Sequence, residues 1–157
     1  EAAACRFAKA STVDGGAVLD IGCGTGFVGA ALSRHGMAAL VGVDPSREML
    51  VRCRTKGVYT QLHAAKVDEL DGMAGLPAAA AIAVGVFTHG HAPLAHLPHA
   101  ARAVQPGGVL GVVLREDIAA SEAFPAALAS MSARYTGRVP VGRFDGQTLD
   151  LHTWHRI

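Results

Sequence analysis

Charged and aromatic side chains are both scarce in this sequence of 157 residues. Only 17% of the residues are charged and 5% are aromatic, and 14 Lys+Arg nearly balance 13 Asp+Glu, for a formal net charge of +1. No basic run supplies the positive surface that a phosphate backbone requires, so we expect no nucleic-acid partner. Half of the residues are hydrophobic, which excludes a disordered chain, and the length fits one domain.

Cysteine is also scarce, with Cys5, Cys23 and Cys53 in unrelated contexts. Three cysteines without a pairing pattern do not indicate a disulfide framework, which predicts a reducing, cytoplasmic location. Residues 72–101 contain no Asp, Glu, Lys or Arg, a length that could span a membrane, but three prolines and four histidines interrupt them. We therefore expect a buried strand there, no signal peptide and no membrane partner.

Short apolar runs alternate with helix-like segments, a pattern typical of βαβ units and a parallel sheet. Near the end, residues 138–144 and 149–157 flank Asp145-Gly146-Gln147 and predict an antiparallel hairpin. The other predicted strands are 17–21, 39–43, 59–63, 80–87 and 109–114, with a turn at 106–108 before the last of these. The predicted helices are 2–10, 27–35, one opened by 44–46 and ended by Gly57, 98–104, and 121–135.

A glycine-rich segment, Asp20-Ile21-Gly22-Cys23-Gly24-Thr25-Gly26, lies between the first of these strands and the helix at 27–35. Glycine allows positive φ angles and lets a ligand approach without a Cβ in the way, and we expect the helix to direct its free N–H groups at an anionic group. Asp44 ends the next strand, 22 positions after Gly22 (44 − 22). That is near the spacing of about 20 at which an acid meets a ribose, so a nucleoside site is predicted.

Two cofactor classes fit the glycines. Gly24-x-Gly26-x-x-Gly29 satisfies the dinucleotide fingerprint, whereas Asp20-x-Gly22-x-Gly24-x-Gly26 satisfies the pattern of S-adenosylmethionine (SAM) enzymes. Residues 18–26 (VLDIGCGTG), 42–50 (GVDPSREML) and 106–108 (PGG) together resemble the three signature regions of class I SAM-dependent methyltransferases. Phe87-Thr88-His89-Gly90-His91 adds a weaker similarity to the Williams-Beuren region methyltransferase-like branch.

The resemblance implies a doubly wound, Rossmann-like α/β fold. Its seven-stranded, mostly parallel sheet would have the order 3-2-1-4-5-7-6, with strand 7 antiparallel and helices on both faces. Residues 1–157 would form a single methyltransferase domain that lacks the N-terminal helix preceding Glu1 in many relatives.

The resemblance also assigns residues to the cofactor. Backbone groups of Gly22, Gly24 and Gly26 would surround the methionine moiety, Asp20 would reach its ammonium directly or through water, and Asp44 would hold the ribose hydroxyls. Met49 and Leu50 stand near the adenine pocket of the family, but a place in the core is the alternative for both. The predicted cofactor-binding set is Asp20, Gly22, Cys23, Gly24, Gly26, Asp44, Pro45, Met49 and Asp68.

Two segments depart from the family pattern. Many members carry an acidic residue near the adenine amino group after strand 3, where this chain has Ala64-Ala65-Lys66-Val67-Asp68. Either Asp68 fills that role or Lys66 replaces the acid. Before strand 4, Ala78-Ala79-Ala80 stands in place of an aromatic-Asp pair.

Four histidines, His89, His91, His96 and His99, follow the strand predicted at 80–87. A metal site is not expected there, because no Cys or carboxylate joins them in the sequence. Imidazole titrates near neutral pH, so His89 or His91 is a candidate general base or acceptor-positioning residue, with simple loop exposure as the alternative.

The predicted reaction is transfer of the SAM methyl group to a small-molecule acceptor by in-line displacement, with S-adenosylhomocysteine as product. Loops at 89–93 and 115–119 would form the acceptor side. An NAD(P)-dependent oxidoreductase and a catalytically weak SAM-binding module are the alternatives. The oligomeric state is left open.

Overall fold

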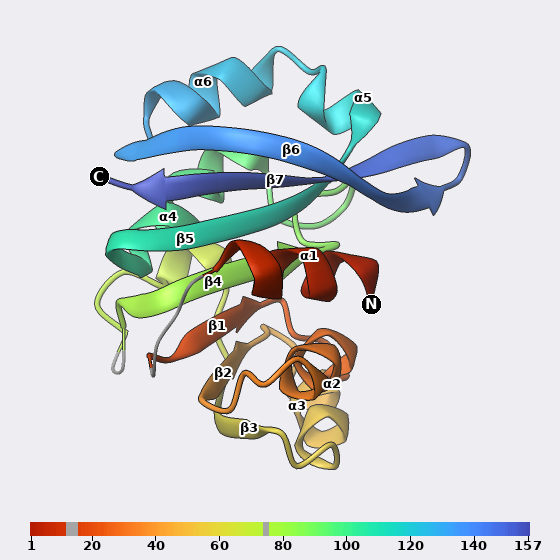
Figure 1. Cartoon of the computed structure of the whole chain (residues 1–157), viewed down its shortest axis with the longest axis vertical. Coiled ribbons are helices and arrows are strands. Elements are labelled where there is room, and N and C mark those ends of the chain that lie inside the picture. The colour runs from red at the N-terminus through yellow and green to blue at the C-terminus, as the bar shows by residue number, and fades with distance from the viewer. Residues whose placement is uncertain (12–15, 74–75) are drawn as a thin grey trace.

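The structure is a computed structural model that describes residues 1–11, 16–73 and 76–157 (Figure 1). Its strands are β1 (Val18–Ile21), β2 (Leu40–Val43), β3 (Tyr59–His63), β4 (Ala78–Val84), β5 (Val104–Arg115), β6 (Ala133–Phe144) and β7 (Gln147–Arg156). Its α-helices are α1 (Ala2–Ala10), α2 (Phe27–Arg34), α3 (Arg47–Arg54), α4 (Leu97–Arg102), α5 (Glu116–Ala119) and α6 (Ala123–Ala129), with short 3-10 helices at Val67–Glu69 and Leu94–His96.

The strands form one sheet of order β3-β2-β1-β4-β5-β7-β6, which confirms the predicted fold. Strands β1 to β5 pair in parallel, and β7 is antiparallel to both β5 and β6. Every residue of β1 and β2 is buried, as expected for central strands covered on both faces. β2 follows β1 on one side of the sheet and β5 follows β4 on the other, so a crevice forms between the carboxyl ends of β1 and β4.

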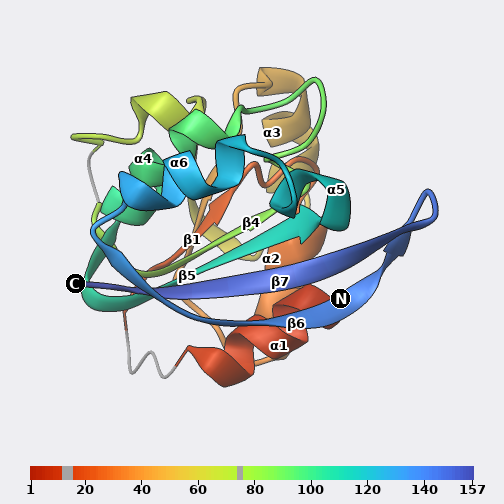
Figure 2. The ribbon, with the colours of Figure 1, turned by 90° about the horizontal axis from the view of Figure 1, so that it is seen from above.

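Helices cover both faces of the sheet. On one face, Phe7 of α1 and Leu32 of α2 join a cluster that includes Ile82 and Leu151. On the other face, α4 and α6 contribute to a larger cluster that includes Trp154. Figure 2 shows α1 on one side of β5 and β7, and α4 and α6 on the other. Alanine and valine thus make up more than half of the buried residues in each of these two clusters.

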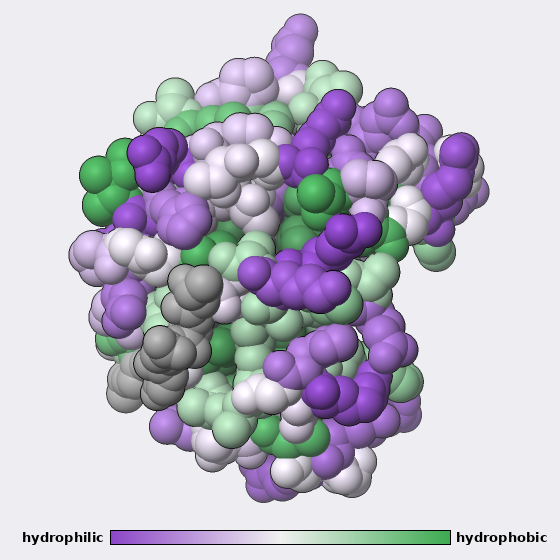
Figure 3. Space-filling model, viewed as in Figure 1, coloured by the Kyte–Doolittle hydropathy of each residue, from purple (hydrophilic) through white to green (hydrophobic). Residues whose placement is uncertain are grey.

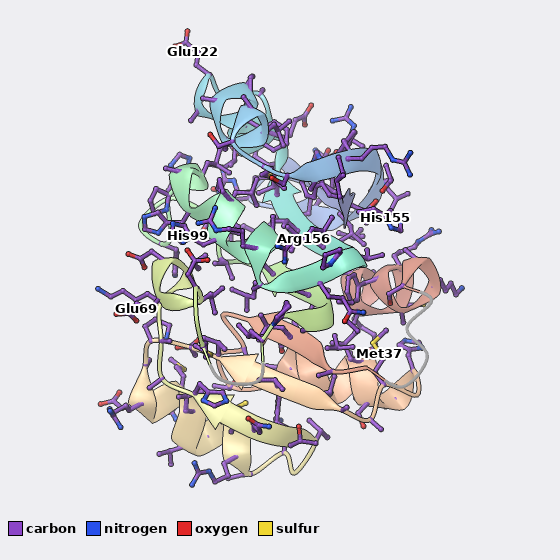
Figure 4. All side chains as sticks on the ribbon, turned by 90° about the vertical axis from the view of Figure 1, so that its left-hand side faces the viewer. Met37, Glu69, His99, Glu122, His155 and Arg156 are labelled. Carbon is purple, nitrogen blue, oxygen red and sulfur yellow. The ribbon has the colours of Figure 1, made fainter. Side chains whose placement is uncertain are left out.

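A glycine in β5 makes room for α1. A Cβ at Gly111 would lie 2.6 Å from Cδ2 of Phe7, too close for real packing, so the phenyl ring rests directly on the strand backbone. Phe7 itself is fully buried. At the end of β7, Arg156 donates hydrogen bonds to the carbonyl oxygens of Arg102 and Val104 and ties this strand to the start of β5 (Figure 4).

Several predicted boundaries were wrong. The helix expected at 121–135 ends at Ala129, and Ala133 to Tyr135 already belong to β6, because they pair with Arg156 to Trp154 of β7. The strand expected to end at Phe87 ends at Val84, since Gly85 has a φ of 73° and turns the chain. The turn expected at 106–108 is a bulge inside β5, across which the pairing with β4 shifts between Ala78 and Ala80.

Strand β6 is one edge of the sheet, with β3 at the other, and it is protected against further pairing. Pro140 lacks an N–H, and the register with β7 shifts on both sides of the central segment. Arg134, Arg138 and Arg143 add charge along the strand. Figure 3 shows hydrophilic and hydrophobic residues interspersed over one face of the molecule. No helix in the described ranges is long and apolar enough to cross a membrane.

The burial of Phe7 can be tested by truncation. Replacing Phe7 with Ala should lower the free energy of unfolding by about 3–5 kcal/mol, because it leaves a cavity between α1 and β5. Phe144→Ala is the matched control, since Phe144 is exposed and should cost less than about 0.5 kcal/mol. Urea unfolding followed by circular dichroism measures both, and equal losses would contradict the proposed anchoring of α1.

Candidate functional site

A cavity of about 680 Å³ lies at the carboxyl ends of β1, β2 and β4. Open α/β sheets bind ligands at this place, where the strand order reverses. Its walls are Ile21, Gly22, Gly24, Val43, Asp44, Pro45, Ser46, Met49, Ala65, Lys66, Val67, Asp68, Gly85, Val86, Gly90, His91, Ala92, Pro93 and His96. Six of the nine predicted cofactor-binding residues are among them, whereas Asp20, Cys23 and Gly26 are not.

The glycine loop bends across the ends of two strands. Its turn depends on φ angles of 67° at Gly22 and 52° at Gly24, and the N–H groups of Gly22 and Cys23 both donate to the carbonyl oxygen of Val43. A Cβ at Gly22 would lie 2.4 Å from Val86, whereas the atom nearest to a Cβ at Gly24 is 4.0 Å away. The loop therefore packs against Val86 at Gly22 and is open at Gly24.

Asp44 holds this loop in place. Its Oδ2 accepts a hydrogen bond from the N–H of Gly24 at 2.9 Å, and its Oδ1 accepts one from the N–H of Ser46 at 2.8 Å. The side-chain cap of α3 is Ser46, whose Oγ accepts from the N–H of Met49, so Asp44 is not the cap of that helix. A carboxylate offers about four acceptor positions, of which two are used here. Asp44 can accept further hydrogen bonds from a ligand in the cavity without moving.

The wall formed by α3 and the segment after β3 is partly polar. Met49 is 38% exposed and lines the cavity, so it does not belong to the core, whereas Leu50 is buried against Cys53. Lys66 and Asp68 both line the cavity. A nucleobase in the cavity would meet the thioether of Met49, the ammonium of Lys66 and the carboxylate of Asp68 on this side.

The histidines separate into two groups. His91 lines the cavity, and its Nδ1 lies 3.0 Å from Oγ1 of Thr88. His89 does not line it, and its Nε2 lies 3.4 Å from Oδ2 of Asp117. Of the two alternative candidates, His91 lines the cavity and His89 does not. Asp117 also accepts from Arg115, and this hydrogen bond lowers the pKa of the Asp117 carboxyl.

His96, which was not among the candidate general bases, also lines the cavity. Nδ1 of His96 lies 3.8 Å from Oδ1 of Asp68, within ion-pair distance when the imidazole is protonated. His99 on α4 points elsewhere, with its Nδ1 2.7 Å from Oδ2 of Asp71 (Figure 4). Among the described residues, no group of three His, Cys, Asp or Glu side chains is arranged to hold a metal ion.

Asp20 lies behind the glycine loop. It is 1% exposed, its Oδ2 accepts a hydrogen bond from the hydroxyl of Tyr59 at 2.5 Å, and its Oδ1 has no partner within the described part of the chain. Burial raises the pKa of Asp20 to about 7, while the hydrogen bond from Tyr59 acts in the opposite direction. The predicted contact of Asp20 with a ligand ammonium remains a prediction.

Cys23 and the start of α2 also differ from a direct ligand-binding arrangement. Cys23 is buried with its Sγ 3.9 Å from Sγ of Cys53, and burial raises the pKa of both thiols, which makes them poor nucleophiles. The free N–H groups at the start of α2 were expected to point at a ligand in the crevice, but that of Gly29 donates to the hydroxyl of Tyr59 at 3.1 Å. Sequence reasoning missed Tyr59, for which the extra glycine of the dinucleotide pattern, Gly29, was the available signal.

The buried state of Asp20 predicts an unusual pH dependence of stability. Its folded pKa of about 7 lies above the ordinary 3.8, so the folded protein binds the proton more tightly than the unfolded chain. The contribution of Asp20 to the free energy of unfolding should be greatest below pH 4 and should fall as the pH rises from about 4 through 7, by at most about 4 kcal/mol. Asp20→Asn should remove this fall in urea unfolding at several pH values, whereas Asp150→Asn, at another buried carboxyl, should retain it. Parallel curves for wild type and Asp20→Asn would contradict the assignment.

Comparison with known proteins places this fold and cavity in context. The profile of a family described as a methyltransferase domain matches residues 18–108, which contain the glycine loop, Asp44 and the bulge of β5. Methyltransferase-like protein 27 of Homo sapiens is 32% identical over 103 residues, covering 62% of this chain and 40% of the human protein. The tRNA U34 carboxymethyltransferase of Cellvibrio japonicus is 33% identical over 99 residues, covering 59% of this chain and 30% of that protein. The chain thus spans less than half the length of either curated relative.

The fold is also found in solved structures. A TehB-like SAM-dependent methyltransferase from Corynebacterium glutamicum superposes with a TM-score of 0.75 at 16% sequence identity. The similarity covers 99% of this chain and 88% of that one. At this identity the likeness shows the fold alone.

Proposed function

The chain belongs to the methyltransferase domain family, and on that premise we propose that it transfers a methyl group from SAM to a small-molecule acceptor by in-line displacement. The observation that carries the proposal is Asp44, which stands at the end of β2, lines the cavity and is held by the backbone of the glycine loop. That arrangement combines an acceptor for ribose hydroxyls with a loop that a ligand can approach closely.

The residues of the cavity wall suit the successive parts of the cofactor. Asp44 would accept from the ribose hydroxyls, and the backbone of Gly22 and Gly24 would face the methionine part. Pro45 and Met49 would cover the adenine, with Asp68 or Lys66 at its polar edge. Gly26, Cys23 and Asp20 lie outside the cavity wall, so their proposed contribution is to the shape and placement of the loop.

When bound, SAM supplies a methyl group activated by its positively charged sulfur. The chain then needs no nucleophile of its own. Its task is to bind and orient the cofactor and the acceptor and to exclude water from the site. His91 lines the cavity from the loop after β4, whereas Asp68 lines it from the segment after β3. With Nδ1 beside the Thr88 hydroxyl, Nε2 is the nitrogen left to accept a proton from an acceptor hydroxyl or amine.

A small acceptor is favoured by the walls near His91. Val86, Ala92 and Pro93 are apolar, and the lysine of the cavity, Lys66, stands among the residues proposed for the adenine. A nucleic-acid acceptor would require several cations arranged to bind phosphates. One curated relative is named as an enzyme of tRNA, so tRNA is the competing acceptor that the test must include.

Two further functions are less well supported. A nicotinamide-dependent oxidoreductase would share the glycine loop, but the antiparallel β7 and the matched family favour SAM. A SAM-binding module without catalysis would retain Asp44 and the cavity but would transfer no methyl group.

Asp44 provides the first test. Hydrogen bonds to a charged group contribute about 1.5 to 3 kcal/mol, so Asp44→Ala should weaken SAM binding by about 10- to 150-fold. Isothermal titration calorimetry measures the affinity. Asp150→Ala is the control, because Asp150 is similarly buried but lies on β7, outside the cavity wall. Unchanged affinity in a folded Asp44→Ala protein would remove the ribose assignment.

The acceptor class is tested by product formation. Purified protein with SAM should release S-adenosylhomocysteine when supplied with members of a library of small amines, alcohols and thiols, and not with bulk tRNA. Mass spectrometry detects the product in both arms. Product formation with tRNA alone would overturn the small-molecule assignment, and SAM binding without any product would favour the non-catalytic module.

Once an acceptor is identified, the roles of the two candidate histidines can be distinguished. His91→Gln should lower kcat by about 100-fold or more if His91 removes a proton in the reaction, while leaving SAM affinity unchanged. His89→Gln should have a much smaller effect, because His89 faces Asp117 rather than the cavity. The reverse order of effects would assign the role to His89.

A further inference from the structure

The hydroxyl of Tyr59 connects three elements that are distant in the sequence. It donates to Oδ2 of Asp20 on β1 at 2.5 Å and accepts from the N–H of Gly29 on α2 at 3.1 Å. Tyr59 is the first residue of β3, near the edge of the sheet, and its side chain passes β2 to reach β1. A single group thus joins the edge strand to the strand and helix that flank the glycine loop.

The side chain of Tyr59 occupies a slot made by glycines. A Cβ at Gly26, Gly29 or Gly42 would lie 3.2, 2.2 or 3.0 Å from the nearest atom of Tyr59. The closest approach, at Gly29, involves both the ring and the hydroxyl oxygen. Gly29 was part of a possible dinucleotide fingerprint, but in the fold this glycine makes room for a tyrosine. Gly29 therefore makes room for Tyr59 alone, whereas Gly26 makes room for Tyr59 together with Cys53, and Gly42 for Tyr59 together with Leu62.

The loop is consequently held from two sides. On the cavity side, Asp44 accepts from the N–H of Gly24. On the opposite side, Tyr59 fixes Asp20, which stands two residues before Gly22 of the cavity wall. We infer that Tyr59 is a positioning residue, which acts through Asp20 to place the glycine loop against the methionine end of the cofactor. This inference rests on the proposed function.

The charge state of Asp20 is part of this arrangement. The titratable groups around it are Tyr59 from β3, Cys53 from α3, Cys23 from the loop and Asp44 from the end of β2, and the backbone of Gly29 also lowers its pKa. Burial and the neighbouring Asp44 raise the pKa of Asp20, and the hydrogen bond from Tyr59 lowers it. Loss of the hydroxyl should therefore let Asp20 retain its proton to higher pH.

Tyr59→Phe tests the inference, because it keeps the ring in its slot and removes only the hydroxyl. The affinity for S-adenosylhomocysteine should fall by about 2- to 12-fold, the effect of one hydrogen bond. The affinity for 5′-methylthioadenosine, which lacks the amino-acid end, should change by less than about 2-fold. In the ligand-free protein, the carboxyl carbon of Asp20 followed by NMR should titrate about 1 pH unit higher than in the wild type.

Tyr135→Phe is the matched control, since Tyr135 is the other tyrosine of the chain and lies on β6. It should alter neither affinity nor the titration of Asp20. Equal loss of affinity for both compounds in Tyr59→Phe, or an unmoved titration of Asp20, would overturn the positioning role while leaving the proposed function intact. A wild-type chain that binds neither compound would overturn the proposed function and, with it, the role of Tyr59 in binding.

Discussion

The geometry of the site depends on the carboxylate of Asp44. Two backbone N–H groups, from Gly24 and Ser46, converge on its two oxygens, so the side chain joins the glycine loop to the start of α3. Without that carboxylate, two N–H groups next to a cavity would lose their partners, and the left-handed turn at Gly24 would lose its anchor. Because the bonds form within the protein, the cost of ordering the loop falls on folding rather than on ligand binding.

Features that depend on local spacing could be predicted from the sequence. Glycines at 22 and 24, an acid at the end of the next strand and a proline directly after that acid are all short-range patterns, and the structure places these residues around one cavity. The sheet order followed from resemblance to a family, and the hairpin supported it independently.

Features that depend on contacts across the fold could not be predicted in this way. Tyr59 meets Asp20 from 39 residues away, and His96 meets Asp68 from 28 residues away, so no local pattern signals either pair. The alanine-rich segment after Ser121 has helical propensity up to the point where pairing with β7 takes over, which is why the predicted helix was too long. Met49 has the spacing of a core residue, but the cavity beside it leaves it exposed.

The order of the last two strands has a consequence for the growing chain. β6 precedes β7 in the sequence, but β7 lies between β6 and β5. A nascent polypeptide that has reached Phe144 therefore has no place in the sheet for its newest strand, and β5 presents open backbone groups until Gln147–Arg156 emerges. Such an open edge is a template for pairing with other chains. Pro140 and the arginines of β6 thus shield only the finished sheet, and the ribosome-bound intermediate lacks that shield.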